Sequence, residues 1–391
     1  MRFSFKNKFI MIINCIIIKC FYVHIKFFCF ICNNMKCLND YIVNVKNLKK
    51  NAFNIRKQLA EKSKFCAIVK ADAYGLGSEI VCKSLYGIAD FFGVACLKEA
   101  MDIRSFDKIT PIVILGMTTI EDLEICSKNN ISISVTSIEQ LRKIQKCNKK
   151  IKIHLQINTG LNRFGIRKLT DFKKVLKIID NDDNLVLEGL YSHFATKEKD
   201  RLFINIQFFK FLQFKNYVKN REVICHIANS YATILSAKYH LDMVRNGFSL
   251  YVGKSEIGNH DVLSIHSQVV NILNLKKGDT VGYDRTFSAK NRMKIAVIPI
   301  GYADGMDRKL SNNFSVIVND QKCPIVGLIC MDVFMVDITG RDVSIGDRVV
   351  ILGSSKTHKL TIFDYAKVLD TSPYEILLKF NHKRMNYIIN I

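Results

Sequence analysis

Residues 65–77, FCAIVKADAYGLG, are the stretch that decides the fold of this chain. The apolar run 67–69 leads directly to Lys70, and Gly75 and Gly77 follow in a turn. A lysine that ends a buried strand is unfavourable unless it has a chemical role, because burial disfavours the charged amine. Imine formation with an aldehyde requires such a lowered amine pKa, and glycines let the backbone approach a phosphate closely. The alternative is an ordinary lysine whose amine reaches solvent from a strand end.

Outward from this stretch, short apolar runs alternate with amphipathic helical stretches between about residues 40 and 250. About eight such units predict an α/β fold in which parallel strands form a (β/α)8 barrel. A doubly wound open sheet is the competing layout, but no G-x-G-x-x-G motif follows the first strand. Helices are expected at 137–145, 169–179 and 203–219. The expected strands are 41–45, 65–69, 91–96, 111–116, 131–136, 151–158, 185–195 and 222–228.

The pattern changes after about residue 262. Short alternating strands are expected there, separated by turns such as Lys277-Gly278-Asp279, and no long helix precedes 362–369. This pattern of short strands and turns predicts a separate, mostly-β domain. We therefore divide the chain into a barrel over 37–261 and a C-terminal β domain over 262–391. The expected strands of the second domain are 267–273, 293–298, 314–318, 332–337 and 348–352.

Bulk composition excludes several classes of function. A formal net charge of +23 over 391 residues invites a nucleic-acid partner, but the lysines are scattered and no aromatic–basic module or zinc-finger spacing occurs. Thirteen cysteines are too dispersed for a disulfide framework, so a reduced, cytoplasmic setting is expected. Cys29 and Cys32 have C-x-x-C spacing but no partner ligands, and no metal site is predicted.

Residues 1–36 form an atypical extension that is basic and apolar and contains no acidic residue. The apolar stretch is interrupted too often for the ~20 residues that a membrane-spanning helix needs, and no membrane partner is expected. A basic start precedes the ten-residue apolar run 9–18, as in a signal peptide, but no small-residue cleavage site follows. A targeting or anchor segment, a poorly ordered extension, and unused upstream sequence with Met35 as the true start all remain open; we favour the last two.

The stretch around Lys70 resembles the cofactor-lysine motif of alanine racemases, pyridoxal-phosphate enzymes that interconvert L- and D-alanine. The resemblance covers roughly residues 40 to 375, and the family architecture is a (β/α)8 barrel followed by a β domain. Further matching segments recur in order along the chain. They are HLQINTGLNRFGI (154–166), YSHFAT (191–196), HIANS (226–230), MVRNGFSLYVG (243–253), VGYDRTFSA (281–289), IPIGYADG (298–305) and GLICMD (327–332).

The resemblance implies a pyridoxal phosphate site. Lys70 would carry the cofactor, and His193 would lie against its ring. Arg245 would face the pyridine nitrogen, where most enzymes of this cofactor place a carboxylate. Because an arginine cannot accept a proton at physiological pH, the nitrogen is expected to stay unprotonated, which limits side reactions such as transamination. The residues expected to bind the phosphate are Tyr74, Ser230, Gly247 and Phe248.

The resemblance also implies a homodimer with shared sites. Lys70 would move the α-proton on one face, and Tyr283 from the second subunit would move it on the other. Arg163 and the Met331 backbone would hold the substrate carboxylate, and Tyr302 would stand at the entrance. The expected partner is thus a small amino acid, alanine, whose D-form would serve peptidoglycan synthesis.

The chain departs from the family pattern at two positions near Arg163 and in its tail. Gln156 stands where many members have a lysine that buttresses the substrate arginine, and Asn158 stands where an aspartate is common. These changes put substrate affinity in question rather than the type of reaction. In the tail HKRMNYII, either His382 or Tyr387 could take the place of the family's phosphate-binding tyrosine.

Three other functions compete with racemisation. An amino-acid decarboxylase on the same scaffold would favour an acidic partner for the ring nitrogen and a cysteine base, which Arg245 and Tyr283 oppose. A non-enzymatic carrier of pyridoxal phosphate would have no use for residues 262–391. A degenerate, inactive copy is the third.

Overall fold

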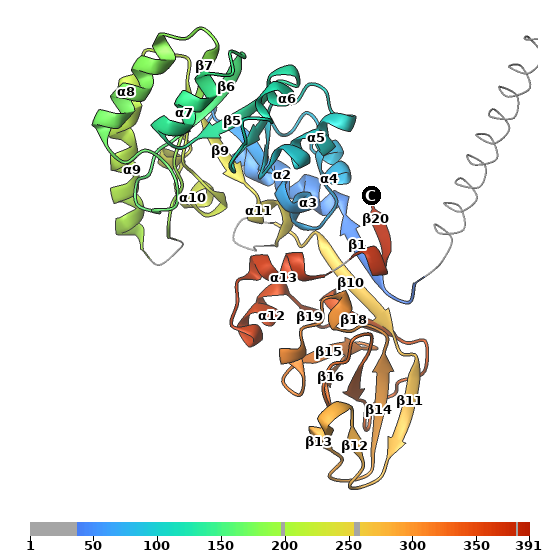
Figure 1. The fold of residues 1–391 in the computed structure, drawn as a ribbon. Helices are drawn as coiled ribbons and strands as arrows, with labels where there is room; N and C mark the ends of the chain where they lie inside the picture. Colours follow the sequence, from blue (N-terminus) through green and yellow to red (C-terminus); the bar gives the residue numbers. More distant parts are fainter. Residues whose placement is uncertain (1–36, 197–199, 254–258, 381) are drawn as a thin grey trace, which may run out of the picture.

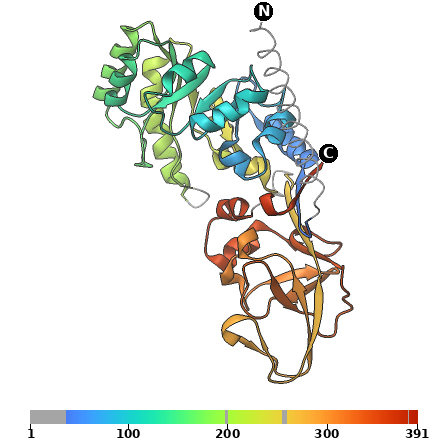
Figure 2. The ribbon, with the colours of Figure 1, turned by 45° about the vertical axis from the view of Figure 1, so that its right-hand side comes forward.

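The structure, a computed structural model, describes residues 37–196, 200–253, 259–380 and 382–391. The predicted N-terminal extension, residues 1–36, lies outside the described residues. Two lobes are visible: the barrel forms one, and the C-terminal β domain forms the other (Figures 1 and 2). Helices α12 (Ile362–Leu369) and α13 (Pro373–Lys379) lie between the lobes, under α11 (Phe248–Tyr251) (Figure 1).

Eight parallel strands build the barrel, and each pairs with its neighbour in chain order until β9 returns to β2. Two backbone hydrogen bonds of 3.0 Å close the remaining gap between β8 and β9, from Asp242 N to Cys225 O and from Arg245 N to Ala228 O. The (β/α)8 prediction is therefore confirmed. The strands are β2 (Lys64–Ile68), β3 (Phe91–Val94), β4 (Ile112–Ile114), β5 (Ile131–Val135), β6 (Ile151–Gln156), β7 (Leu185–Tyr191), β8 (Ile224–His226) and β9 (Met243–Asn246).

The helices between these strands bury one face against the barrel. In α7 (Ile138–Gln145), for example, Leu141 and Ile144 are buried, and the Ser137 side chain accepts a hydrogen bond from Gln140 N at the helix start. The remaining helices of this lobe are α2 (Val45–Gln58), α3 (Lys70–Tyr74), α4 (Ser78–Ser84), α5 (Leu97–Phe106), α6 (Leu123–Lys128), α8 (Leu169–Asp180), α9 (Arg201–Lys215) and α10 (Ser230–Leu235).

One predicted barrel strand lies elsewhere. Residues 41–45 were expected to open the barrel, but β1 (Asp40–Asn44) pairs antiparallel with β10 (Leu263–Gln268) and parallel with β20 (Asn386–Asn390) in the second sheet. The eighth barrel strand is β9, which the expected strands omitted. The physical reason is visible in burial: β1 alternates between buried and half-exposed residues, whereas β3, β4 and β5 are buried throughout, as parallel barrel strands are.

The C-terminal lobe is mostly β, as predicted. Its main sheet runs β16-β15-β18-β10-β1-β20, with β19 paired to β18, and a three-stranded sheet β11-β14-β17 continues away from the barrel. The further strands are β11 (Asn271–Leu275), β12 (Thr280–Val281), β13 (Phe287–Ser288), β14 (Met293–Ile298), β15 (Ser315–Val318), β16 (Gln321–Pro324), β17 (Phe334–Asp337), β18 (Arg348–Ser354) and β19 (Lys359–Leu360).

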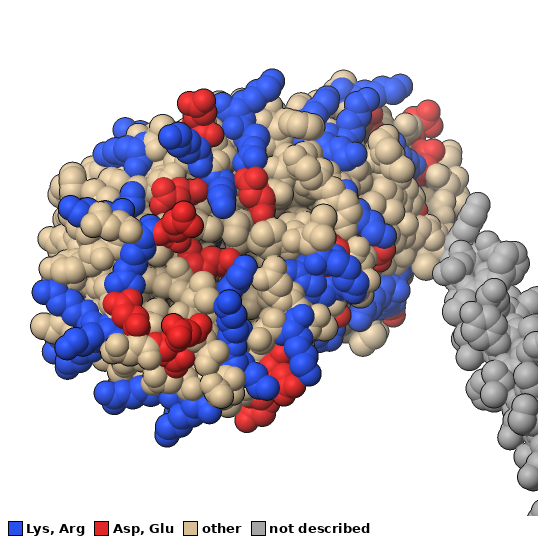
Figure 3. Space-filling view, turned by 90° about the horizontal axis from the view of Figure 1, so that it is seen from above, with Lys and Arg blue, Asp and Glu red and all other residues tan. Residues whose placement is uncertain are grey.

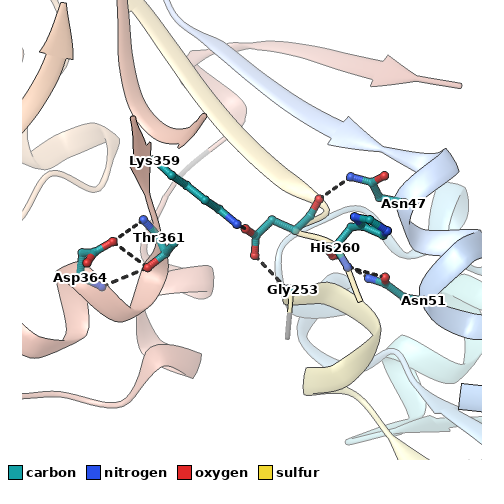
Figure 4. Close-up of polar contacts among 8 residues, drawn as sticks. Asn47, Asn51, Gly253, His260, Lys359, Thr361 and Asp364 are labelled. Carbon is teal, nitrogen blue, oxygen red and sulfur yellow. Dashed lines mark hydrogen bonds and ion pairs between the residues drawn. The ribbon is translucent and has the colours of Figure 1, made fainter. Parts of the chain in front are cut away.

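Asp261 ties the two lobes together (Figure 4). Its carboxylate accepts a hydrogen bond from Gly253 N at 2.9 Å and pairs with Lys359 Nζ at 2.6 Å, while its carbonyl accepts from Asn47 Nδ2 at 2.8 Å. The neighbouring Asn51 side chain bonds both the N–H and the C=O of His260, each at 2.7 Å (Figure 4). The junction is thus held from α2 on one side and from β19 on the other.

Charges are mixed on the surface. On the face seen from above the barrel, lysines and arginines alternate with acidic residues and form no single basic stripe (Figure 3). Among the residues that the structure describes, no helix is both long and apolar enough to cross a membrane.

Candidate active site

Lys70 lies where β2 ends, at the start of an unusual turn. The four residues after it, 71–74, all have a left-handed backbone, with φ between 52° and 61°, and Gly75 continues at 84°. Such a turn costs L-residues roughly 1–2 kcal/mol each. Backbone bonds offset part of this cost, from Ala73 N to Val69 O and from Gly75 N to Ala71 O, each at 2.9 Å.

Glu99 of α5 fixes the beginning of the same turn. Its carboxylate accepts hydrogen bonds from Ala71 N at 2.8 Å and from Ala95 N at 2.7 Å, and so connects the ends of β2 and β3. Burial lowers the pKa of Lys70, and the charge on Arg163 lowers it further, while Glu99 acts in the opposite direction. Lys70 itself is exposed, and the lowered pKa makes its neutral amine, the form that attacks an aldehyde, more accessible than in a free lysine.

The four predicted phosphate residues lie together beside this turn. Ser230 Oγ accepts hydrogen bonds from Gly247 N at 3.1 Å and from Ser249 N at 3.3 Å. The Tyr74 hydroxyl lies against Gly247, where a Cβ atom would be only 2.6 Å from the phenol oxygen. Phe248 is the next residue along, at the start of α11. A hydroxyl, a phenol and backbone N–H groups thus converge on one point at which only glycine fits.

Tyr374 also belongs to this group, and the sequence analysis missed it. Its ring centroid lies 4.3 Å from that of Phe248 and 6.2 Å from that of Tyr74. Tyr374, Phe248 and Ser230 line a cavity of about 660 Å³, a size typical of small-molecule sites. The available signal was the Ser372-Pro373 helix start, which brings Tyr374 into the first turn of α13.

The two candidates proposed for the tail lie on another side of the turn. The Tyr387 hydroxyl donates to Leu76 O, and the His382 ring packs against Tyr41 and Tyr387 at centroid distances of 5.6 and 5.4 Å. Tyr374, rather than either of them, lies beside Tyr74 and Phe248.

Arg245 is buried at the centre of the barrel and donates in several directions. Its guanidinium contacts Ser192 O at 2.7 Å, His226 Nδ1 at 2.6 Å and His193 Nδ1 at 3.2 Å, and it stacks over the Tyr191 ring. Burial lowers the pKa of Arg245 to about 10, so it remains charged at neutral pH. Burial and then the charges on Arg245 and Arg163 lower the pKa of His193 to about 3.

These donations fix a directed chain of hydrogen bonds. An arginine can only donate, so His226 accepts at Nδ1 and carries its proton at Nε2, which lies 2.8 Å from His154 Nδ1. His154 in turn carries its proton at Nε2 and donates to Glu188 at 3.0 Å. Burial and the Arg245 charge hold the pKa of His226 well below its usual range. His226 is therefore held as one neutral tautomer, the hydrogen bonds of His154 to His226 and Glu188 fix the orientation of its ring, and Arg245 cannot rotate freely.

Arg163 lies in the loop after β6 and is exposed. Among the residues that the structure describes, its guanidinium has no hydrogen bond or ion pair. Gln156 does not buttress it: Gln156 Oε1 lies 3.0 Å from the Tyr191 hydroxyl. Asn158 instead shapes the loop, because its side chain accepts from Gly160 N at 3.1 Å and from Asn162 N at 3.2 Å.

Three predicted residues lie away from Lys70 within one chain. Tyr283 follows β12 at the far end of the C-terminal lobe (Figure 1) and is 68% exposed. Tyr302 and Met331 are 46% and 52% exposed, and backbone bonds from Tyr302 N to Cys330 O and from Ala303 N to Met331 O hold their segments together. One chain alone does not bring these groups to the turn of Lys70.

Comparisons with known proteins agree with this arrangement. The family model "Alanine racemase, N-terminal domain" matches residues 43–255, and "Alanine racemase, C-terminal domain" matches residues 262–388. "Alanine racemase 1" of Caldanaerobacter subterraneus subsp. tengcongensis is 36% identical over 85% of this chain and 90% of its own length. "Alanine racemase" of Methanococcus maripaludis is 34% identical over 86% and 94%.

Solved structures give the same result. Alanine racemase from Bacillus anthracis with bound L-Ala-P superposes with a TM-score of 0.82 and 30% identity, over 88% of this chain and 93% of that one. Alanine racemase from E. faecalis superposes with a TM-score of 0.86 and 25% identity, over 90% and 98%.

Proposed function

This chain belongs to the alanine racemase family, and we propose that it works with pyridoxal phosphate held between Lys70 and Ser230. Its activity is the interconversion of L- and D-alanine. The observation that carries the proposal is the left-handed turn that begins after Lys70, an amine of lowered pKa, and ends at Tyr74, whose hydroxyl lies against Gly247.

The residues present fit the cofactor. Ser230 Oγ, the Tyr74 hydroxyl and the N–H groups of Gly247 and Phe248 would hold its phosphate, with Tyr374 as a further donor. The absent Cβ at Gly247 leaves the room in which the Tyr74 hydroxyl lies. When bound, pyridoxal phosphate supplies an aldehyde that binds amines and a ring that stabilises negative charge at the α-carbon.

Arg245 would face the ring nitrogen as a permanent donor. The chain through His226, His154 and Glu188 fixes its orientation, and burial together with its charge keeps the neighbouring His193 neutral. A donor that never accepts a proton leaves the nitrogen unprotonated, so negative charge stays near the α-carbon. This supports prompt reprotonation there and disfavours transamination.

Two acid–base groups would act on opposite faces of the α-carbon. Lys70 would hold or release the proton on one face, and Tyr283 of a second copy would do so on the other. The second copy is needed because Tyr283 is exposed at the far end of its own chain (Figure 1). We therefore propose a homodimer in which both subunits build each site.

The substrate carboxylate would be held by Arg163 from the barrel and by the Met331 backbone of the other subunit, with Tyr302 at the entrance. A free guanidinium suits a planar carboxylate. Since Gln156 contacts Tyr191 instead of Arg163, the arginine is less restrained than a buttressed one, and we expect weaker substrate binding rather than a changed reaction.

Cellular context completes the proposal. The nine cysteines within the described ranges are all free thiols, which fits the reducing cytoplasm. There the product, D-alanine, would supply peptidoglycan synthesis. The decarboxylase and the single-barrel carrier receive no support from the comparisons, because alanine racemase models match both lobes.

The test combines cofactor binding with exchange of subunits. Purified full-length protein is expected to show the visible absorbance band of lysine-bound pyridoxal phosphate and to convert L- to D-alanine. Lys70→Ala should lose both, and Tyr283→Phe should lose turnover but keep the band. A Lys70→Ala protein that keeps the band and the activity would refute the assignment.

Mixing the two inactive variants tests the shared site. A mixed dimer contains one site with both Lys70 and Tyr283 intact, so random exchange should restore roughly a quarter of wild-type activity. If the mixture stays as inactive as its components after subunit exchange is confirmed, Tyr283 does not act across the dimer.

A further inference from the structure

The exit of the Lys70 turn is held by two tyrosines from the C-terminal lobe's main sheet. The Tyr41 hydroxyl donates to Gly75 O at 2.9 Å, and the Tyr387 hydroxyl donates to the next carbonyl, Leu76 O. Tyr41 lies on β1 and Tyr387 on β20, and the two residues are paired in register in these parallel strands. The rings stack with their centroids 6.0 Å apart.

The turn itself explains why it needs such support. Residues 71–74 adopt left-handed conformations that non-glycine residues normally avoid. They carry Lys70 at one end and Tyr74 at the other, so any relaxation of the turn displaces both groups. Glu99 fixes the beginning of the turn through Ala71 N, but only the two tyrosines bond its final carbonyls among the described residues.

The packing at this point is specific. A Cβ atom on Gly77 would lie 2.5 Å from the Tyr387 phenol oxygen, so the hydroxyl reaches the backbone only because residue 77 is glycine, with φ of +92°. Tyr41 is fully buried. Burial raises the pKa of Tyr387 to about 12 and that of Tyr41 well above its ordinary value. Both phenols therefore remain protonated donors at every physiological pH.

We infer that Tyr41 and Tyr387 are positioning residues that clamp the cofactor turn from the C-terminal sheet and so set the affinity for pyridoxal phosphate. The inference rests on the proposed function, since it assumes that the turn of Lys70 and Tyr74 binds the cofactor. The C-terminal strand β20 thereby acts in its own chain's site, while Tyr283 of the same lobe would serve the other subunit.

The experiment measures cofactor affinity in the full-length protein. Tyr41→Phe and Tyr387→Phe each keep the ring and its stacking but remove the hydroxyl. Apo-protein is titrated with pyridoxal phosphate, and the visible band is followed to saturation. Loss of one hydrogen bond to the turn should raise the apparent dissociation constant roughly three- to tenfold, with turnover at saturating cofactor changed much less.

Tyr365→Phe is the matched control. Its buried hydroxyl also donates to a backbone carbonyl, Ile351 O, but inside the C-terminal lobe and away from the turn. All three variants should lower the melting temperature of the apo-protein, whereas only Tyr41→Phe and Tyr387→Phe should weaken cofactor binding. A merely structural role predicts that the control and the two test variants behave alike.

The outcomes separate this inference from the proposed function. A dissociation constant for Tyr387→Phe within about twofold of wild type would overturn the clamp, even if the wild-type band forms and Lys70→Ala abolishes it. Tyr387 is only half-buried, so its variant decides the matter if Tyr41→Phe does not fold. Absence of any band in wild type would instead refute the proposed function itself.

Discussion

Glu188→Gln tests the directed hydrogen-bond chain that orients Arg245. Glu188 ends this chain, and its carboxylate accepts from His154 Nε2 at 3.0 Å and from Ser132 Oγ, and pairs with Lys152 Nζ at 3.1 Å. A glutamine keeps the shape and can still accept from His154 through its amide oxygen. The substitution therefore removes the charge and leaves the geometry.

The pKa of Glu188 gives the expected magnitude. Burial acts to raise it, but the hydrogen bonds from His154, Ser132 and Lys152 together outweigh burial, and the pKa falls from 4.5 to about 2. At about 1.36 kcal/mol per tenfold change in acidity, the ionised form stabilises the fold by about 3 kcal/mol. Lys152 is 40% exposed, so solvent screens its ion pair with Glu188. The stabilisation of the fold by the ionised carboxylate is therefore reduced toward about 2 kcal/mol.

The sign of the pH dependence follows from the lowered pKa. A carboxylate whose pKa is lower in the folded than in the unfolded state contributes its full stability above the unfolded value. That contribution disappears as the pH falls through the folded value. We expect a loss of about 2 to 3 kcal/mol for Glu188→Gln at pH 7, shrinking by roughly a third at pH 3.5.

The assay is urea-induced unfolding followed by circular dichroism at both pH values. Glu222→Gln is the matched control, because Glu222 is exposed and has no ion pair within the described part of the chain. A difference below about 0.5 kcal/mol at pH 7, or one that is equal at both pH values, would show that the carboxylate is not held in this way.

Three further substitutions probe the site. Gly247→Ala should weaken binding of pyridoxal phosphate at least about tenfold, because the new Cβ would lie 2.6 Å from the Tyr74 phenol oxygen. A titration of the visible band measures the affinity, and an unchanged affinity would contradict the prediction. Gly189→Ala should lower the free energy of unfolding by about 1–3 kcal/mol, since its Cβ would lie 2.2 Å from His154 Nδ1. Urea unfolding measures the loss, and wild-type stability would argue against close packing of Gly189 on the His154 ring. Tyr374→Phe should raise the cofactor dissociation constant several-fold without lowering turnover at saturation; equal affinity would remove Tyr374 from the phosphate site.

Much of the fold follows from local pattern. Apolar runs predicted seven of the barrel strands. The change near residue 262, from alternating strands and helices to short strands separated by turns, predicted the β lobe. These patterns are informative because a buried parallel strand needs a continuous apolar run and a half-buried strand needs alternation. The placement of 41–45 in the barrel was wrong. The burial of β1 alternates, which is the pattern of a half-buried strand and not of a barrel strand buried throughout.

Some features of the site depend on contacts between residues far apart in the chain. Sequence pattern could indicate that Lys70 ends a barrel strand, but not that Arg245 lies on one or that His226 and His154 connect it to Glu188. Tyr374 lies 300 positions beyond Tyr74, and only the docking of α13 brings the two rings together.

The amino-acid sequence by itself determined the type of most barrel elements, the family and the chemistry that the strand ends offer, because these depend on local periodicity and on residue type. Tertiary structure alone decided which sheet receives β1, which tyrosine joins the phosphate donors and what restrains the left-handed turn of Lys70. Each of these features depends on which distant segments contact one another. Those contacts are determined by close packing and by the need of each buried polar group for a hydrogen bond.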